Sequence, residues 1–134
     1  MKIKKACLNT SKKPIVVCSE KGKKISFINK RRISIEQIKI DGCQIQEGKK
    51  CDFLVRTSDN EYFIELKGSN IKHGILQLKE SMRKLASKRV TRAFIVARRF
   101  PRTGASLLNQ QSKFRREVGI KLELKKLNHE EKII

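Results

Sequence analysis

Three residues whose side chains could act together lie on two neighbouring segments of the chain, Asp52 on the first and Glu65 and Lys67 on the second. If residues 57–60 form a four-residue hairpin loop, Asp52 lies directly opposite Glu65. Residues two apart on a strand share a face, so Lys67 joins Glu65 there. Carboxylates this close repel each other unless a cation lies between them, and hard divalent metals prefer oxygen ligands. The spacing therefore predicts a metal site with an ammonium group beside it.

The same register predicts how this hairpin packs. It pairs Arg56 with Glu61 and gives the hairpin one apolar face, made of Cys51, Phe53, Val55, Tyr62, Ile64 and Leu66. The acidic residues fall on the other face, which we expect to be the less apolar of the two. The alternative is a cross-strand cluster of ion pairs on a solvated face, as many hairpins have.

The segment between about residues 41 and 82 resembles the core motif of the PD-(D/E)XK nuclease superfamily. The resemblance consists of Cys51-Asp52-Phe53-Leu54-Val55, then twelve residues between Asp52 and Glu65, then Glu65-Leu66-Lys67-Gly68. Gln77, on the segment that follows, matches a glutamine found in several branches of the superfamily.

The resemblance implies a metal-dependent hydrolase of phosphodiester bonds with a restriction-endonuclease-like fold. Asp52, Glu65 and the backbone carbonyl of Leu66 would bind Mg²⁺, for which Mn²⁺ could substitute. Lys67 would orient or activate the attacking water, and Gln77 would support the site.

The sequence departs from the family pattern at three places. Cys51 stands where the motif has its proline, and Ser81 follows Gln77 where one branch has tyrosine. The superfamily core usually opens with a helix that contributes a further acid, and residues 1–50 show no clear helix. The candidates for that acid are Glu20, Glu36 and Asp41.

The elements that position these residues can be predicted from apolar spacing. Ile71, Ile75, Leu78, Met82 and Leu85 form a helical stripe over residues 71–85, which Ser69 or Asn70 can cap. Strands are expected at 14–18, 25–29, 33–40 (with a bulge at 36–37), 51–56, 61–67, 92–98 and 120–125, and a second helix from about 107 to 118. Strands followed by alternating helices favour an α/β fold with a single mixed β-sheet flanked by helices.

The chain has 134 residues, which favours a single domain. Within it we expect a strand-rich part at 1–50, a catalytic core at 51–98 and a C-terminal helix and strand at 99–134. Four cysteines, at 7, 18, 43 and 51, lack the close pairing typical of zinc sites. We therefore expect buried, reduced thiols, with a zinc-stabilised binding module as the weaker alternative and disulfides disfavoured.

The formal net charge of +20 favours a nucleic-acid partner. Residues 1–32 hold eleven Lys and Arg against one acid, and residues 83–126 hold fourteen against two. The expected phosphate contacts are Arg83, Lys84, Arg98, Arg99, Arg102, Lys113, Arg115 and Arg116. Because the chain has six Phe, one Tyr and no Trp, stacking on single strands is poorly supported. DNA held by its backbone is favoured over RNA.

The composition also bears on the cellular compartment of the protein and on its partners. No apolar run approaches the 18 residues of a membrane span, and the basic N-terminal segment lacks the apolar stretch of a secretory signal. We expect a cytoplasmic protein, acting as a homodimer or with a helicase or defence-system partner. The alternative function is a non-catalytic, basic nucleic-acid-binding protein on the same fold.

Overall fold

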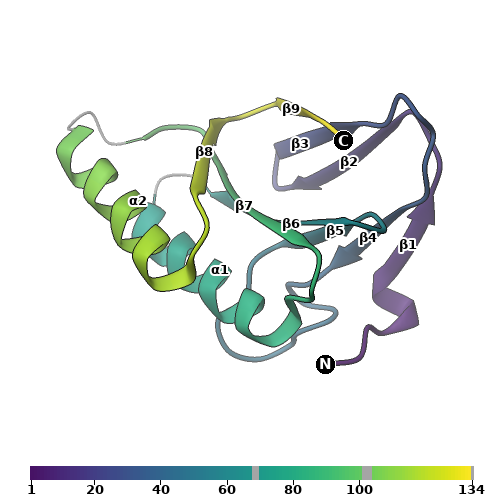
Figure 1. The fold of residues 1–134 in the computed structure, drawn as a ribbon, viewed down its shortest axis with the longest axis horizontal. Coiled ribbons are helices and arrows are strands. Elements are labelled where there is room, and N and C mark those ends of the chain that lie inside the picture. The colour runs from purple at the N-terminus through teal and green to yellow at the C-terminus, as the bar shows by residue number, and fades with distance from the viewer. Residues whose placement is uncertain (68–69, 101–103, 134) are drawn as a thin grey trace.

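The computed structural model describes residues 1–67, 70–100 and 104–133, and places two β-sheets beside two α-helices (Figure 1). The larger sheet has the strand order β1-β4-β5-β6-β7-β8, and the smaller has the order β2-β3-β9. The elements are a 3₁₀ helix Lys5–Cys7, β1 Leu8–Ser11, β2 Ile15–Glu20, β3 Lys23–Ile28, β4 Ile35–Lys39, β5 Phe53–Arg56, β6 Asn60–Lys67, α1 Ile71–Leu85, β7 Val90–Ala97, α2 Gly104–Val118, β8 Leu122–Lys126 and β9 His129–Lys132. Within these described residues, no helix is long and apolar enough to cross a membrane.

The larger sheet is mixed, which confirms the α/β prediction. Strands β1, β4, β5 and β6 pair antiparallel, whereas β6, β7 and β8 pair parallel. The carboxyl ends of the three parallel strands therefore meet at one edge of the sheet. In open α/β sheets this is the edge at which ligands usually bind.

The prediction of a single sheet is wrong, because β2, β3 and β9 form a second sheet of their own. This smaller sheet packs its apolar side chains against one face of the larger one. The cluster joins Val16, Cys18, Ile25 and Phe27 of the smaller sheet to Tyr62, Ile64, Phe94 and Val96 of the larger. The central strands β6 and β7 are apolar on both faces, so each face needs a cover.

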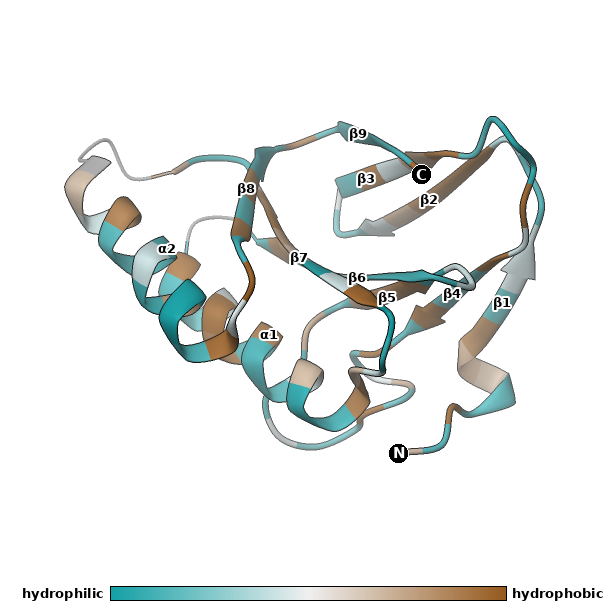
Figure 2. Cartoon of the chain, viewed as in Figure 1, coloured by the Kyte–Doolittle hydropathy of each residue, from teal (hydrophilic) through white to brown (hydrophobic). Residues whose placement is uncertain are grey.

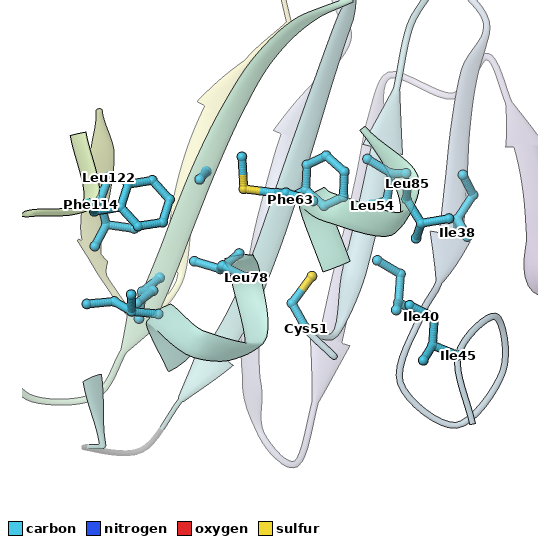
Figure 3. Packing of buried hydrophobic residues seen from close by; sticks show 14 of the residues in the cluster. Ile38, Ile40, Ile45, Cys51, Leu54, Phe63, Leu78, Leu85, Phe114 and Leu122 are labelled. Carbon is cyan, nitrogen blue, oxygen red and sulfur yellow. The ribbon is translucent and has the colours of Figure 1, made fainter. Parts of the chain in front are cut away.

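The other face of the larger sheet is covered by α1 and α2. The stripe of α1 lies in one cluster with Leu54 and Phe63 of the sheet and with Phe114 of α2 (Figure 3). Both helices carry apolar positions interspersed with polar ones (Figure 2), as expected for helices covered on one side. Helix α1 has the predicted bounds, and its predicted cap Asn70 accepts a hydrogen bond from the His73 N–H (3.1 Å).

The face that bears the acidic residues is therefore buried, contrary to the prediction. Leu54 and Phe63, which share this face with Asp52 and Glu65, are both 0% exposed. The predicted register is confirmed for β5, since Arg56 pairs with Glu61 and Phe53 with Ile64. Asp52 precedes this strand, and its N–H donates to the Ile64 carbonyl. The register places the acids on one face, but only the position of α1 decides that this face is covered.

The bulge predicted at residues 36–37 is absent. Strand β4 pairs in unbroken register with β1 on one side and β5 on the other. Ile35 lies in the cluster beneath the smaller sheet, and Ile38 lies in the cluster beneath α1. Because both faces are buried, apolar residues three apart fit a regular strand and require no bulge.

Two of the four cysteines form a disulfide, which contradicts the prediction of four reduced thiols. Cys7 and Cys43 are bonded, with Cα atoms 5.7 Å apart, whereas Cys18 and Cys51 are free and buried. Strand β1, which the sequence analysis missed, pairs with β4 and carries the N-terminal segment to the loop that follows β4. Gln44 binds the same segment, accepting from Lys4 N–H (2.8 Å) and donating to the Lys2 carbonyl (2.8 Å).

Replacing both cysteines, Cys7→Ser and Cys43→Ser, should lower the free energy of unfolding. The bridge spans a sequence separation of 36 residues, and closing such a loop restricts the unfolded chain by about 4 kcal/mol at most. Denaturant unfolding of the oxidised protein and the double variant measures the difference. Dithiothreitol should destabilise the wild type and leave the double variant unchanged; equal sensitivity in both would contradict the assignment.

Candidate active site

A pocket of about 240 Å³ lies at the carboxyl end of β6, where the tip of the β2–β3 hairpin meets the larger sheet. We call it the carboxylate pocket. It is lined by Glu20, Lys21, Lys23, Asp41, Asp52, Glu65, Leu66, Lys67 and Gln77. Acidic and basic side chains from distant parts of the sequence thus converge on one hollow at the edge of the sheet where the parallel strands end.

Asp52 is held in place through both its backbone and its carboxylate. Its N–H donates to the Ile64 carbonyl (3.0 Å), and its carbonyl accepts from the Ile40 N–H (2.9 Å). Its Oδ2 accepts from the backbone N–H of Leu66 (2.7 Å). Asp52 is 7% exposed and lines the pocket, so these bonds fix a nearly buried carboxylate there.

Glu65 and Lys67 form an ion pair at the end of β6. Lys67 Nζ lies 3.1 Å from Glu65 Oε2, with the glutamate side chain 2% and the lysine side chain 20% exposed. Glu65 Oε1 is buried and has no hydrogen-bond partner among the described residues. A buried carboxylate oxygen without a donor is costly unless a ligand satisfies it.

Burial and repulsion both favour the protonated forms of the two acids. The pKa of Glu65 is raised to about 8, chiefly by burial and then by the charge of Asp52, with a partial offset by Lys67. Burial also raises the pKa of Asp52; the Leu66 N–H opposes that shift, and Asp41 and Glu20 add to it. A cation bound between the two carboxylates would stabilise both charged forms.

Helix α1 lies directly against the acidic strand. A Cβ atom on Gly74 would lie 3.3 Å from Lys67 Cγ, 3.3 Å from Ile95 Cδ1 and 3.4 Å from Glu65 Cγ. Glycine at this position therefore lets the helix approach the stems of Glu65 and Lys67. One turn further on, Gln77 reaches the pocket, and its Oε1 is buried with no hydrogen-bond partner among the described residues.

Ser81, on the same helix, positions the start of β5. Its Oγ accepts a hydrogen bond from the backbone N–H of Cys51 (2.8 Å), and Ser81 is fully buried. Cys51 immediately precedes Asp52, so this bond joins α1 to the strand end that presents the first carboxylate. The sequence showed Ser81 only as a departure from the family pattern and held no signal for this role.

The five residues predicted at the centre of the site converge as expected, since Asp52, Glu65, Leu66, Lys67 and Gln77 all line the carboxylate pocket. Glu20, Glu36 and Asp41 were the predicted candidates for a further acid. Glu20 and Asp41 line the pocket, whereas Glu36 pairs with Arg56 (2.9 Å) away from it.

The predicted phosphate-binding residues are scattered. Arg98 and Arg99 are exposed and follow Ala97, which pairs with Lys67 across β6 and β7. They therefore lie at the same edge of the sheet as the pocket. Arg83 and Lys84 pair with Glu80 in the last turns of α1, at the opposite end of the helix from the pocket.

The remaining predicted contacts lie on or before α2. Lys113, Arg115 and Arg116 are exposed on that helix, and Lys113 lies 3.8 Å from Glu117. Arg102 falls outside the described residues. Lys21 and Lys23 also line the pocket, although no motif in the sequence marked them. Their only sequence signal was that they belong to the basic segment 1–32.

The oxygen donors of the pocket fit a hard divalent cation. Across the described residues, no group of three or more His, Cys, Asp or Glu side chains is close enough to hold a metal ion. The two central carboxylates nevertheless supply oxygen atoms, and Glu65 Oε1 lacks a partner among those residues. Two carboxylates together with a carbonyl oxygen are ligands of the kind that Mg²⁺ uses when water completes its coordination.

Comparisons of this chain with protein-family models, curated proteins and solved structures found no match. The resemblance to PD-(D/E)XK nucleases therefore depends on the motif itself.

The stability of the protein should fall as pH rises through neutrality, because the folded state raises the pKa of Glu65 from 4.5 to about 8. The protonated carboxyl stabilises the fold fully below about pH 4.5, and this contribution is lost as pH approaches 8. Between pH 5 and 8 in EDTA, we expect the Tm of the wild type to fall by roughly 5 °C or more beyond any fall in Glu65→Gln.

Calorimetry can test this with Glu47→Gln, which removes an exposed carboxylate, as the control. Mg²⁺ added at pH 8 should raise the Tm of the wild type and of Glu47→Gln, but not of Glu65→Gln. Parallel pH curves for the wild type and Glu65→Gln would show that Glu65 titrates normally.

Gly74→Ala should destabilise the protein by about 1 to 2 kcal/mol, although alanine is the better helix former, because the added Cβ crowds the strand. Ile95→Val removes Cδ1, one of the two atoms that would lie 3.3 Å from that Cβ. Gly74→Ala should therefore lower the free energy of unfolding less in the Ile95→Val background than in the wild type. Denaturant unfolding of both single variants and the double variant measures this difference. Strict additivity would contradict the close contact.

Proposed function

We propose that this protein is a metal-dependent phosphodiester hydrolase acting on DNA, with a restriction-endonuclease-like core. The observation that supports this most directly is the meeting of Asp52, Glu65 and Lys67 in one pocket with a buried, unpartnered oxygen on Glu65. Carboxylates from adjacent strands with a lysine two residues after the second are what the motif requires. The mixed sheet with α1 directly after β6 is compatible with such a core.

Asp52, Glu65 and the carbonyl oxygen of Leu66 would hold Mg²⁺, or Mn²⁺ in its place. When bound, the ion supplies positive charge to offset that of the phosphate and to acidify a coordinated water. The bond from the Leu66 N–H to Asp52 Oδ2 fixes one carboxylate oxygen and leaves Oδ1 for a ligand. On Glu65, Oε2 is taken by Lys67 and Oε1 remains.

Lys67 and Gln77 would act on the attacking water. Lys67 Nζ has hydrogen-bond donors beyond the one directed at Glu65, and they can orient a water or stabilise charge on the phosphate. The Gln77 Oε1 atom can accept a hydrogen bond from the same water and so help to orient it. Hydrolysis adds the water oxygen to phosphorus and breaks the bond to the departing oxygen, while protons exchange with solvent.

DNA binding would depend on the basic groups around this edge of the sheet. Arg98 and Arg99 are exposed beside the carboxyl end of β6 and can contact backbone phosphates. A second copy of this chain, or a helicase or defence-system partner, would contribute to targeting.

A second candidate is a non-catalytic nucleic-acid-binding protein on the same fold. The observation that favours it is that no cluster of three metal-ligating side chains occurs among the described residues. This candidate predicts salt-sensitive binding without metal-dependent cleavage, and only a small effect on affinity of changes at Glu65 or Lys67.

A cleavage assay on plasmid and branched DNA, with Mg²⁺, Mn²⁺ or EDTA, separates the two. We expect metal-dependent cutting that Asp52→Asn and Lys67→Ala each reduce about 100-fold or more. Asp59→Asn and Lys88→Ala, at exposed positions near the far end of the β5–β6 hairpin, serve as matched controls and should retain full activity. DNA binding without cutting, unchanged in all these variants, would reject the hydrolase in favour of the binding protein.

A further inference from the structure

The tip of the β2–β3 hairpin, residues 20–23, is a short turn that presents two lysines. Glu20 pairs with Lys23, which leaves Lys21 and Gly22 as a two-residue turn. Both turn residues have positive φ, 49° for Lys21 and 78° for Gly22, as in the type I′ turns that suit β-hairpins. Asn, Asp or Gly is the usual first residue of such a turn, and a lysine there carries a conformational cost.

The β2–β3 hairpin is held over the carboxylate pocket by apolar contacts with the larger sheet. Val16, Cys18, Ile25 and Phe27 are at most 5% exposed and pack against the larger sheet. The hairpin tip therefore stays at the pocket, where Lys21 and Lys23 line the same hollow as Asp52 and Glu65.

The ammonium groups of this tip are available to a ligand. Among the residues that the structure describes, neither Lys21 nor Lys23 has a carboxylate within the 4.0 Å that defines an ion pair. In contrast, Arg83, Lys84 and Lys113 each pair with a glutamate on their own helix. An unpaired lysine at the mouth of a pocket can bind an anion without first breaking an internal ion pair.

We propose that the hairpin tip is a phosphate clamp, in which Lys21 and Lys23 bind the DNA backbone next to the phosphate that enters the carboxylate pocket. The inference deepens the proposed function and depends on it for the identity of the ligand. The clamp would hold the substrate strand from the smaller-sheet side of the pocket, with Arg98 and Arg99 at the ends of the parallel strands. Lys21 and Lys23 are then binding residues, and the hydrolytic step remains with Asp52, Glu65 and Lys67.

The competing explanation is that the two lysines only offset the carboxylates of the pocket. The two explanations differ in what the removal of both lysines does to DNA binding. A clamp predicts weaker DNA binding with Mg²⁺ affinity unchanged or increased, because fewer cations then oppose the metal. Pure charge compensation predicts the same increase in Mg²⁺ affinity without a specific loss of DNA contacts.

The test measures binding of a fluorescent 20-base-pair DNA duplex by the full chain in EDTA, with Asp52→Asn in every protein to exclude cleavage. Salt titration compares three proteins: this background, Lys21→Gln with Lys23→Gln, and Lys12→Gln with Lys13→Gln. Lys12 and Lys13 are exposed at the other end of the same hairpin, roughly 20 Å away along β2. Replacing them removes the same net charge as replacing Lys21 and Lys23.

We expect the plot of log affinity against log salt concentration to become less steep by about 1.8 in the hairpin-tip variant, since each lost phosphate contact contributes about 0.9. In the variant that replaces Lys12 and Lys13, this slope should change by less than half as much. Replacing both tip lysines by arginine should preserve the slope, and circular dichroism melting checks that each variant is folded. Calorimetric titration with Mg²⁺, in proteins that retain Asp52, should show no loss of affinity in the tip variant.

Equal slopes in the tip and control variants, or an unchanged slope in the tip variant, would overturn the clamp. Absence of duplex binding by the background protein would overturn the clamp together with the DNA-binding part of the proposed function. If the tip variant alone loses its contacts but the wild type never cuts DNA, the clamp stands and the hydrolase fails.

Discussion

The joint burial of Asp52 and Glu65 at the end of β6 is the constraint to which the rest of the structure responds. Two carboxylates that share a covered position repel each other and lose hydration. The chain stabilises Asp52 with a backbone N–H and Glu65 with Lys67, yet one oxygen of Glu65 keeps no partner among the described residues. A buried carboxylate oxygen without a donor carries a free-energy cost, which the surrounding core offsets.

The two-sided cover of the larger sheet makes this burial possible. Helix α1 closes one face, and Gly74 allows it to approach the acidic strand. The smaller sheet closes the other face and brings residues 20–23 to the pocket. Ser81 joins the helix to the strand end that precedes Asp52. The bond from Ser81 and the contacts of residues 20–23 join segments far apart in the sequence, so the pocket forms only when both layers have packed.

The large positive charge is not distributed as one uniform surface. Some basic residues are used within the fold: Arg92 pairs with Glu123 and Glu131 over the aromatic rings of Tyr62 and Phe94. Arg98, Arg99, Lys21 and Lys23 lie at the edge that holds the pocket and have no such pairs among the described residues. Net charge alone does not reveal which cations are paired within the fold and which are unpaired.

The sequence by itself determined the local features of this protein. The hairpin register, the face shared by Asp52, Glu65 and Lys67, and the bounds of α1 follow from the period of a strand, the length of a loop and the period of a helix. These depend on neighbours close in the chain. Tertiary structure decided the rest: the second sheet, the covering of the acidic face, the bond between Cys7 and Cys43, and the arrival of Lys21 and Lys23 at the pocket. Those outcomes depend on which apolar faces pack together, and a single sequence shows that a face is apolar without showing what covers it.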